Sequence, residues 1–169
     1  IAPAIAQYRA ALAINPEQAS ALYGLGNMMN IEGNYDEALR LYQQSLANRP
    51  DHVPTLVNHG SLLAFRGDFR AAEESFRKAA ELEPTAFAPQ RQLGELLLRE
   101  ERLDEAIERL SAALDIEPDH GPVHLKLSIA YAAAGRVEQA LEHAQKAQAL
   151  GETVPPDFLA RLRQGAGQS

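Results

Sequence analysis

The sequence predicts an all-α protein made of repeated pairs of helices, and three observations indicate this class. Glycine, proline and alanine recur with one shared period of 34 residues. Apolar residues return every three or four positions, which is the spacing of one helix face, and a proline ends each unit because it cannot continue a helix. A constant period of this length is typical of repeat architectures. The residues that define it are Gly26, Gly60 and Gly94, then Pro16, Pro50, Pro84 and Pro118, and finally Ala4, Ala38, Ala72, Ala106 and Ala140.

The first stretch, residues 1–18, is expected to be the second helix of an incomplete unit. Ala4, Tyr8 and Leu12 are apolar at helical spacing. Pro16 follows them and ends the segment. The chain therefore starts with half a repeat.

Four whole units follow, and each is expected to hold two antiparallel helices of about a dozen residues. In three units a glycine stands at the predicted turn between the helices, where it can adopt a positive φ at little steric cost. Glu101 stands there in the third unit, and we expect that turn to close differently because a Cβ resists this conformation. The units are 19–52, 53–86, 87–120 and 121–154, with turns near Gly33, Gly67, Glu101 and Gly135.

The C-terminal stretch departs from the repeat. Residues 155–164 are expected to form a short capping helix with Phe158, Leu159 and Leu162 on its apolar side. Terminal units of solenoids need a polar outer face, and this helix supplies one. Residues 165–169 are predicted to be a disordered tail of small residues.

These residues resemble the tetratricopeptide repeat (TPR) in their order of small, aromatic and proline positions. The resemblance spans residues 1–154. It implies about four and a half repeats stacked as a right-handed superhelical α-solenoid, which forms a single domain over residues 1–169. The matching residues are Leu25, Leu93 and Leu127 at the large aliphatic position, with His59 as the departure; Gly26, Gly60, Gly94 and Ser128 at the small position; and Tyr42, Phe76, Leu110 and Ala144 at the large apolar position of the second helix.

The composition excludes several classes of function. A net charge of −7 argues against nucleic-acid binding, because the phosphate backbone requires clustered lysine and arginine. No uninterrupted apolar run approaches the roughly 20 residues that cross a bilayer, so we expect no membrane insertion. The absence of cysteine excludes disulfides and thiolate metal sites but leaves both a cytoplasmic and a periplasmic location open. Abundant alanine and an excess of arginine over lysine suggest a bacterial source.

Nothing in the sequence predicts catalysis. Gly24 and Gly26 lack the third glycine and the preceding strand of a nucleotide-binding turn. His120 and His124 are four residues apart but have no third ligand nearby, so we expect solvated histidines. His59 is expected to be partly buried and hydrogen-bonded. We therefore predict no enzyme activity, no metal site and no cofactor.

Helical spacing places a candidate binding surface. In the first helix of each unit, one stripe of residues packs the core, and the opposite stripe is expected to line the concave groove of the superhelix. The first half of this stripe is polar and uncharged, and its asparagines offer both a donor and an acceptor to a peptide backbone. The candidate residues are Tyr23, Asn27, Asn30, Asn58, Ser61, Phe65, Arg91, Glu95, Arg99, Leu125 and Lys126.

The family resemblance supports two of these residues. Asn27 and Asn58 match asparagines with which TPR domains hold peptides, as in the O-linked N-acetylglucosamine transferase and the carboxylate-clamp co-chaperones. The clamp is incomplete here, because its lysine is replaced by Tyr23 and its later lysine and arginine by Ala88 and Gln92. We therefore do not expect chaperone tails to bind in that manner.

The second half of the stripe is basic, although the protein as a whole is acidic. Arg91, Arg99 and Lys126 lie there, and Glu95 is the only acidic residue among the candidate groove positions. One hypothesis is that the groove takes an extended segment with acidic side chains, positioned by Arg91 and Arg99. The alternative is an ordinary solvated helix face, whose charges contribute little.

The predicted function is a protein–protein interaction module that binds an extended peptide or a partner helix in the groove. Two alternatives stay open: a substrate-selecting array of a larger, glycosyltransferase-like enzyme, and a self-assembling structural solenoid. Because the chain begins in the middle of a repeat, we expect a piece of a longer protein with an open N-terminal end. Self-association there would use Ile1, Ile5, Tyr8 and Leu12. The sequence does not set the partner or the oligomeric state.

Overall fold

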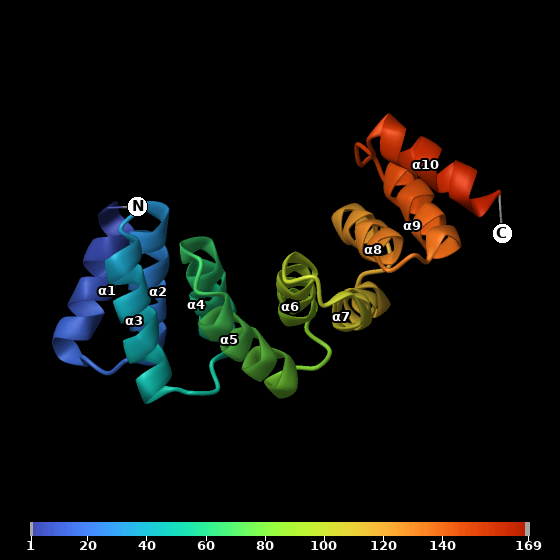
Figure 1. The fold of residues 1–169 in the computed structure, drawn as a ribbon. Coiled ribbons are helices and arrows are strands. Elements are labelled where there is room, and N and C mark those ends of the chain that lie inside the picture. Colours follow the sequence, from blue (N-terminus) through green and yellow to red (C-terminus); the bar gives the residue numbers. More distant parts are fainter. Residues whose placement is uncertain (1, 168–169) are drawn as a thin grey trace. The chain divides into compact units, whose positions relative to one another are not determined.

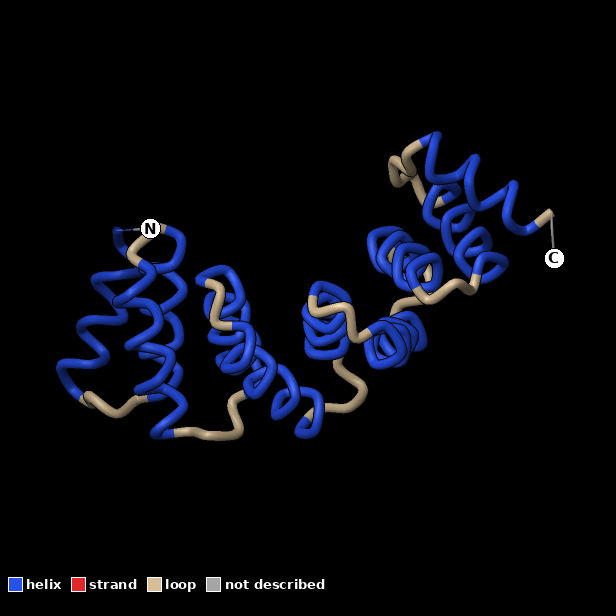
Figure 2. The backbone as a smooth tube through the Cα atoms, viewed as in Figure 1, coloured by secondary structure: helices blue, strands red, loops and turns tan. Residues whose placement is uncertain are grey.

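A computed structural model describes residues 2–167 of the chain. Helices joined by short loops make up this part, and none of its residues lies in a strand (Figure 2). The predicted all-α class is confirmed. The helices labelled in Figure 1 are α1 (Ala2–Ile14), α2 (Ala19–Ile31), α3 (Tyr35–Asn48), α4 (Val53–Arg66), α5 (Phe69–Leu82), α6 (Phe87–Arg99), α7 (Leu103–Ile116), α8 (Gly121–Ala133), α9 (Val137–Ala149) and α10 (Pro156–Ala166).

The chain divides into two compact units, Ile1–Pro84 and Thr85–Ser169. The first unit contains α1 to α5 and the second contains α6 to α10. Successive helices pack as pairs, namely α2 with α3, α4 with α5, α6 with α7 and α8 with α9. Each of these pairs falls within one 34-residue interval of the sequence, so the sequence period corresponds to a helix pair.

Glycines allow the two helices of a pair to approach closely. A Cβ on Gly26 would lie 2.7 Å from the ring of Tyr42, and one on Gly60 would lie 2.8 Å from the ring of Phe76. A methyl group does not fit at these distances, so the large ring of the second helix occupies the space that glycine leaves on the first. The third pair repeats the arrangement with Gly94 and Leu110, at 2.7 Å.

The core of the first unit forms between α1, α2, α3 and α4. Its centre is Tyr42, which is fully buried, and apolar side chains from all four helices surround it. Val53, Leu56 and Ala79 form a second, smaller cluster. The main cluster contains Ile5, Leu22, Leu25, Met29, Ala38, Leu41, Tyr42 and Leu62.

Three of the apolar side chains of α1 that were predicted to drive self-association contact the core of the first unit. Ile5 is buried, and Tyr8 and Leu12 pack against the main cluster of the first unit. The ring of Tyr8 fills the space over Gly24 of α2. These three side chains therefore have packing partners within the first unit, and self-association through the N-terminal end stays a prediction. Ile1 lies outside the described residues.

The C-terminal helix α10 caps the second unit, as predicted. It packs on α9, and Leu159 and Leu162 are buried in the core of this unit. The helix continues through Ala166, so residues 165 and 166 of the predicted tail are helical. Residues 168 and 169 of that tail lie outside the described part of the chain.

The turn at Glu101 closes in the same way as the glycine turns, which corrects the expectation from the sequence. Glu101 has φ 61°, whereas Gly33 and Gly67 have φ 77° and 88°. The amide of Glu101 donates to the carbonyl of Leu98 at 3.1 Å and the next amide donates to Leu97 at 3.0 Å. Gly67 and the residue after it make the corresponding bonds. These bonds satisfy the last carbonyls of the helix and hold an exposed glutamate in the left-handed conformation.

Replacing Glu101 with glycine is expected to stabilise the protein by about 0.5–1 kcal/mol. The left-handed conformation costs a residue with a Cβ about 1–2 kcal/mol, and the greater freedom of glycine in the unfolded chain takes back about 0.4–1 kcal/mol. Urea unfolding measures the difference. Glu32→Gly is the control, because Glu32 has φ −77° and glycine there should destabilise by about 0.5–1 kcal/mol. Equal effects of the two substitutions would contradict the argument.

Candidate functional site

Helices α2 and α4 bring six of the candidate residues together in the first unit. Tyr23, Asn27 and Asn30 lie on one face of α2, because residues three or four apart are neighbours on a helix. Asn58, Ser61 and Phe65 have the same spacing on α4. We call these six residues the unit 1 groove: Tyr23, Asn27, Asn30, Asn58, Ser61 and Phe65.

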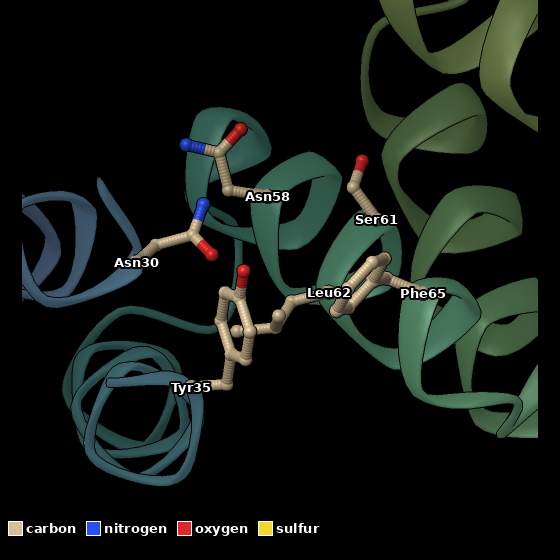
Figure 3. A pocket seen from close by; sticks show the side chains of 6 residues that line it. All are labelled: Asn30, Tyr35, Asn58, Ser61, Leu62 and Phe65. Atoms are coloured by element: carbon tan, nitrogen blue, oxygen red, sulfur yellow. The ribbon is translucent and has the colours of Figure 1, made fainter. Parts of the chain in front are cut away.

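A cavity of about 320 Å³ opens on this groove. Figure 3 shows the Tyr35 hydroxyl pointing toward the amides of Asn30 and Asn58. The Phe65 ring lies near Leu62, across the cavity from the Asn30 amide. No charged side chain is among the residues that line the cavity. They are Asn30, Tyr35, Asn58, Ser61, Leu62 and Phe65.

The two central asparagines are joined in one hydrogen-bond network. Asn58 Nδ2 donates to Asn27 Oδ1 at 2.8 Å and also lies 3.3 Å from the hydroxyl oxygen of Tyr23. The Tyr42 hydroxyl donates to the same oxygen of Asn27 at 2.7 Å. Burial raises the pKa of Tyr42 to about 12, so this phenol keeps its proton at neutral pH and remains a donor. The network therefore fixes two amide groups before any ligand arrives.

An aromatic pair forms the apolar side of the cavity. The rings of Tyr35 and Phe65 lie 5.1 Å apart between centroids, at an interplanar angle of 60°. Phe65 is 69% exposed, which is unusual for a large apolar side chain. An exposed ring that is held by a neighbouring ring is suited to contact an apolar side chain of a ligand.

The five candidates of the second unit lie on α6 and α8. Arg91 Nη1 and Glu95 Oε1 form an ion pair of 2.8 Å within α6, and the Arg91 guanidinium lies 5.9 Å from the ring centroid of Phe87. Arg99 and Lys126 are exposed. Leu125 is partly buried and packs against the core of this unit. Glu95 therefore neutralises one of the three basic residues that the sequence placed on this face.

The structure corrects the prediction that His124 is solvated. His124 is only 8% exposed. Its Nδ1 lies 2.8 Å from Nδ1 of His143, and its Nε2 lies 2.9 Å from the carbonyl oxygen of Pro118. Burial, with His124 nearby, lowers the pKa of His143. The repeat period could not show this pair, because His143 lies at a position of α9 that the sequence reasoning did not consider.

His59 lies half-buried and hydrogen-bonded, as expected. Its Nδ1 is 3.0 Å from Ser75 Oγ. Its Nε2 is buried, and the described part of the chain supplies no hydrogen-bond partner for it. Burial lowers the pKa of this imidazole, so its neutral form is favoured in the folded protein.

Two kinds of feature are absent from the described residues. No helix within residues 2–167 combines the length and the apolar character of a membrane span. Nor do residues 2–167 contain a group of three or more histidine, aspartate or glutamate side chains placed to hold a metal ion.

Sequence reasoning missed three residues of this site. Tyr35 was assigned to the start of a helix, and Tyr42 to packing within the core, while Leu62 was not considered. The signal for Tyr42 was its hydroxyl: the equivalent positions of the next two repeats hold Phe76 and Leu110, which pack without donating a hydrogen bond.

Comparison with known proteins places the chain among repeat proteins. Profiles of the tetratricopeptide repeat match residues 17–83, 57–120 and 97–153. Among solved structures, MamA AMB-1 is 32% identical over 79% of this chain and 78% of that chain, with a TM-score of 0.70. MamA from Desulfovibrio magneticus RS-1 is 23% identical over 89% and 92%, with a TM-score of 0.75.

A further solved structure is YrrB, described as a TPR protein with an unusual peptide-binding site. It is 24% identical over 95% of this chain and 81% of that chain, with a TM-score of 0.77. Curated proteins give no significant match. The matched profiles extend over both units, and the helix pairs of the structure have the period that these profiles describe. The chain belongs to the tetratricopeptide repeat family.

Proposed function

We propose that this chain is a protein-interaction module, not an enzyme, and that it binds an extended peptide segment in the unit 1 groove. One observation carries the proposal: an uncharged cavity places the hydrogen-bonded amide of Asn58 beside the exposed ring of Phe65. Membership of a repeat family that provides extended binding surfaces supports a binding role in general. The description of YrrB as a peptide-binding protein is consistent with this role.

The groups around the cavity indicate what the peptide must present. Asn30 can donate to a backbone carbonyl and accept from a backbone amide. Asn58 can accept through its oxygen, because its amide nitrogen already donates to Asn27 and Tyr23. Phe65 and Tyr35 offer an apolar surface for one side chain. Burying a charged side chain here would leave it without a partner, which is costly. The favoured ligand is therefore an uncharged extended segment with one large apolar residue.

An acidic stretch in the partner is a second, weaker element of the proposal. On the second unit, Arg99 and Lys126 are exposed, and Arg91 forms an ion pair with Glu95. Exposed charge pairs contribute little to affinity. We therefore expect an acidic segment to bind this face of the second unit more weakly than an apolar residue binds the unit 1 groove.

A peptide library tests the main proposal. The probe is a set of fluorescent 12-residue peptides without charged residues, each with a central phenylalanine or leucine, titrated by anisotropy. Phe65→Ala should raise the Kd of the tightest peptide at least about tenfold, because a lost aromatic contact is worth about 1.5–3 kcal/mol when buried. Asn58→Ala should have a similar effect.

Two matched variants serve as controls for this experiment. Ile14→Ala removes an apolar side chain that is 88% exposed on α1, and Asn48→Ala removes an exposed asparagine at the end of α3. Neither should change the Kd. If no peptide binds, or if Phe65→Ala and Asn58→Ala bind as well as the wild type, the unit 1 groove is not the binding site.

Two further measurements address the remaining alternatives. An acidic peptide without the apolar residue should bind the wild type with a lower Kd than it binds an Arg99→Ala, Lys126→Ala double variant; equal Kd values would contradict a role for these charges. Light scattering at high concentration should give the mass of a monomer. A concentration-dependent rise in mass would favour the self-assembling solenoid instead.

A further inference from the structure

We propose that Tyr42 is a positioning residue, whose buried hydroxyl orients the side-chain amides of Asn27 and Asn58. In this orientation the groove offers one hydrogen-bond donor and one acceptor to a single peptide residue. This inference rests on the proposed function, because it describes how the same groove reads a peptide backbone. It adds a residue that lies beneath the binding surface. Tyr42 itself is fully buried.

The hydrogen bonds determine which atoms of the two asparagines stay available. Asn27 Oδ1 accepts from both Tyr42 and Asn58, so its amide nitrogen is left to donate. Asn58 Nδ2 donates to Asn27 Oδ1 and lies within hydrogen-bond distance of the Tyr23 hydroxyl, so its oxygen is left to accept. Within residues 2–167, neither of these two atoms has a hydrogen-bond partner, and neither is among the buried atoms that lack one. Both therefore reach solvent.

This pattern is complementary to an extended peptide. One residue of a β-strand presents its N–H and its C=O on the same edge and exchanges both with a neighbour. Asn58 Oδ1 can accept that N–H while Asn27 Nδ2 donates to that C=O. Without the Tyr42 hydroxyl, the Asn27 amide loses one of the two donors that fix its orientation, and a flipped amide would present the wrong group.

The repeat itself provides the comparison that isolates the hydroxyl. The equivalent pairs of the next two repeats are Ser61 with Phe76 and Glu95 with Leu110, and neither Phe76 nor Leu110 can donate a hydrogen bond. Phe76 packs over its glycine in the same way as Tyr42. A phenylalanine is therefore compatible with this position, and Tyr42→Phe removes the hydroxyl alone.

The experiment measures amide order and peptide affinity in Tyr42→Phe. In NMR spectra, the side-chain amide protons of Asn58, which donate to Asn27 and Tyr23, should exchange several-fold faster with water than in the wild type. The Kd of the tightest uncharged library peptide should rise about tenfold, the effect expected for loss of one good hydrogen bond. N-methylating the central peptide residue should weaken binding to the wild type by a larger factor than binding to Tyr42→Phe.

A matched control separates positioning from stability. Tyr8 occupies the equivalent position of the half repeat, and the described residues supply no hydrogen-bond partner for its hydroxyl. Tyr8→Phe should leave affinity and amide exchange unchanged, and both variants should keep a Tm within about 4 °C of the wild type. A Tyr42→Phe protein with wild-type amide exchange overturns the proposal, whether or not a peptide binds. Failure of every peptide to bind the wild type would instead count against the proposed function.

Discussion

Replacing Gly60 with alanine is expected to destabilise the protein by about 1–3 kcal/mol, which is the cost of inserting a methyl group into a packed core. The added Cβ would lie 2.8 Å from the Phe76 ring, and Phe76 is only 2% exposed. The ring therefore cannot move into solvent without losing its packing. On an isolated helix the same substitution would be favourable by about 0.5–1 kcal/mol. The close contact between α4 and α5 reverses the sign.

The cause can be tested by removing the ring. Phe76→Ala alone should cost about 3–5 kcal/mol, as for other buried phenylalanines. In the Phe76→Ala background there is no ring to meet the new methyl group, so Gly60→Ala should become stabilising by about 0.5–1 kcal/mol. Urea unfolding of the four proteins forms a double-mutant cycle. The dependence of the free energy of unfolding on urea concentration should be compared among the four proteins, because a repeat protein that loses cooperativity shows a changed slope.

A substitution on the same helix provides the baseline for helix propensity. Ala64→Gly should cost about 1 kcal/mol in both backgrounds, because Ala64 is not part of the contact between Gly60 and Phe76. If Gly60→Ala destabilises the two backgrounds equally, the close approach of the helices does not explain why glycine recurs at this position.

The sequence period predicted the helix pairs and their close contacts because both arise from backbone geometry. Glycine at one repeat position faces a large apolar side chain at another in three successive units, so repetition makes the contact visible. The same argument placed Asn27 of α2 and Asn58 of α4 on the stripe expected to line the groove. It did not show that these two asparagines bond to one another, since that depends on how α2 and α4 approach in space.

Features that occur once in the chain were the ones that sequence reasoning missed. Glu101 adopts a left-handed conformation because the hydrogen bonds that end α6 outweigh the steric preference of one exposed residue. His124 and His143 come together because α8 and α9 are paired, and no periodic pattern marks them. The hydroxyl of Tyr42 was hidden by the packing role of its ring. Side-chain partners across helices thus require the structure, whereas the helices themselves do not.

Replacing His59 with leucine is expected to stabilise the protein by about 1–2 kcal/mol at pH 7.5, because it removes a buried polar atom without a partner. The Ser75 hydroxyl donates to the carbonyl of Ala71 at 3.0 Å, so it accepts from His59 Nδ1. His59 Nε2 is then the unprotonated nitrogen, and it is the buried atom without a hydrogen bond in the described residues. Leucine has a similar volume and occupies the equivalent position of the other repeats.

The gain from this substitution should grow as the pH falls below about 6.5. Burial lowers the pKa of His59 from its ordinary value of 6.5, so the unfolded chain binds a proton at a higher pH than the folded protein does. Folding stability is then lost as the pH falls from 6.5 toward the folded pKa, and leucine removes this loss. Urea unfolding at pH 7.5 and pH 5.5 measures it. The pKa of His143 is also lowered, but its effect is the same in the wild type and in His59→Leu and cancels when their stabilities are compared. An equal gain in stability at the two pH values would show that His59 is not held in its neutral form.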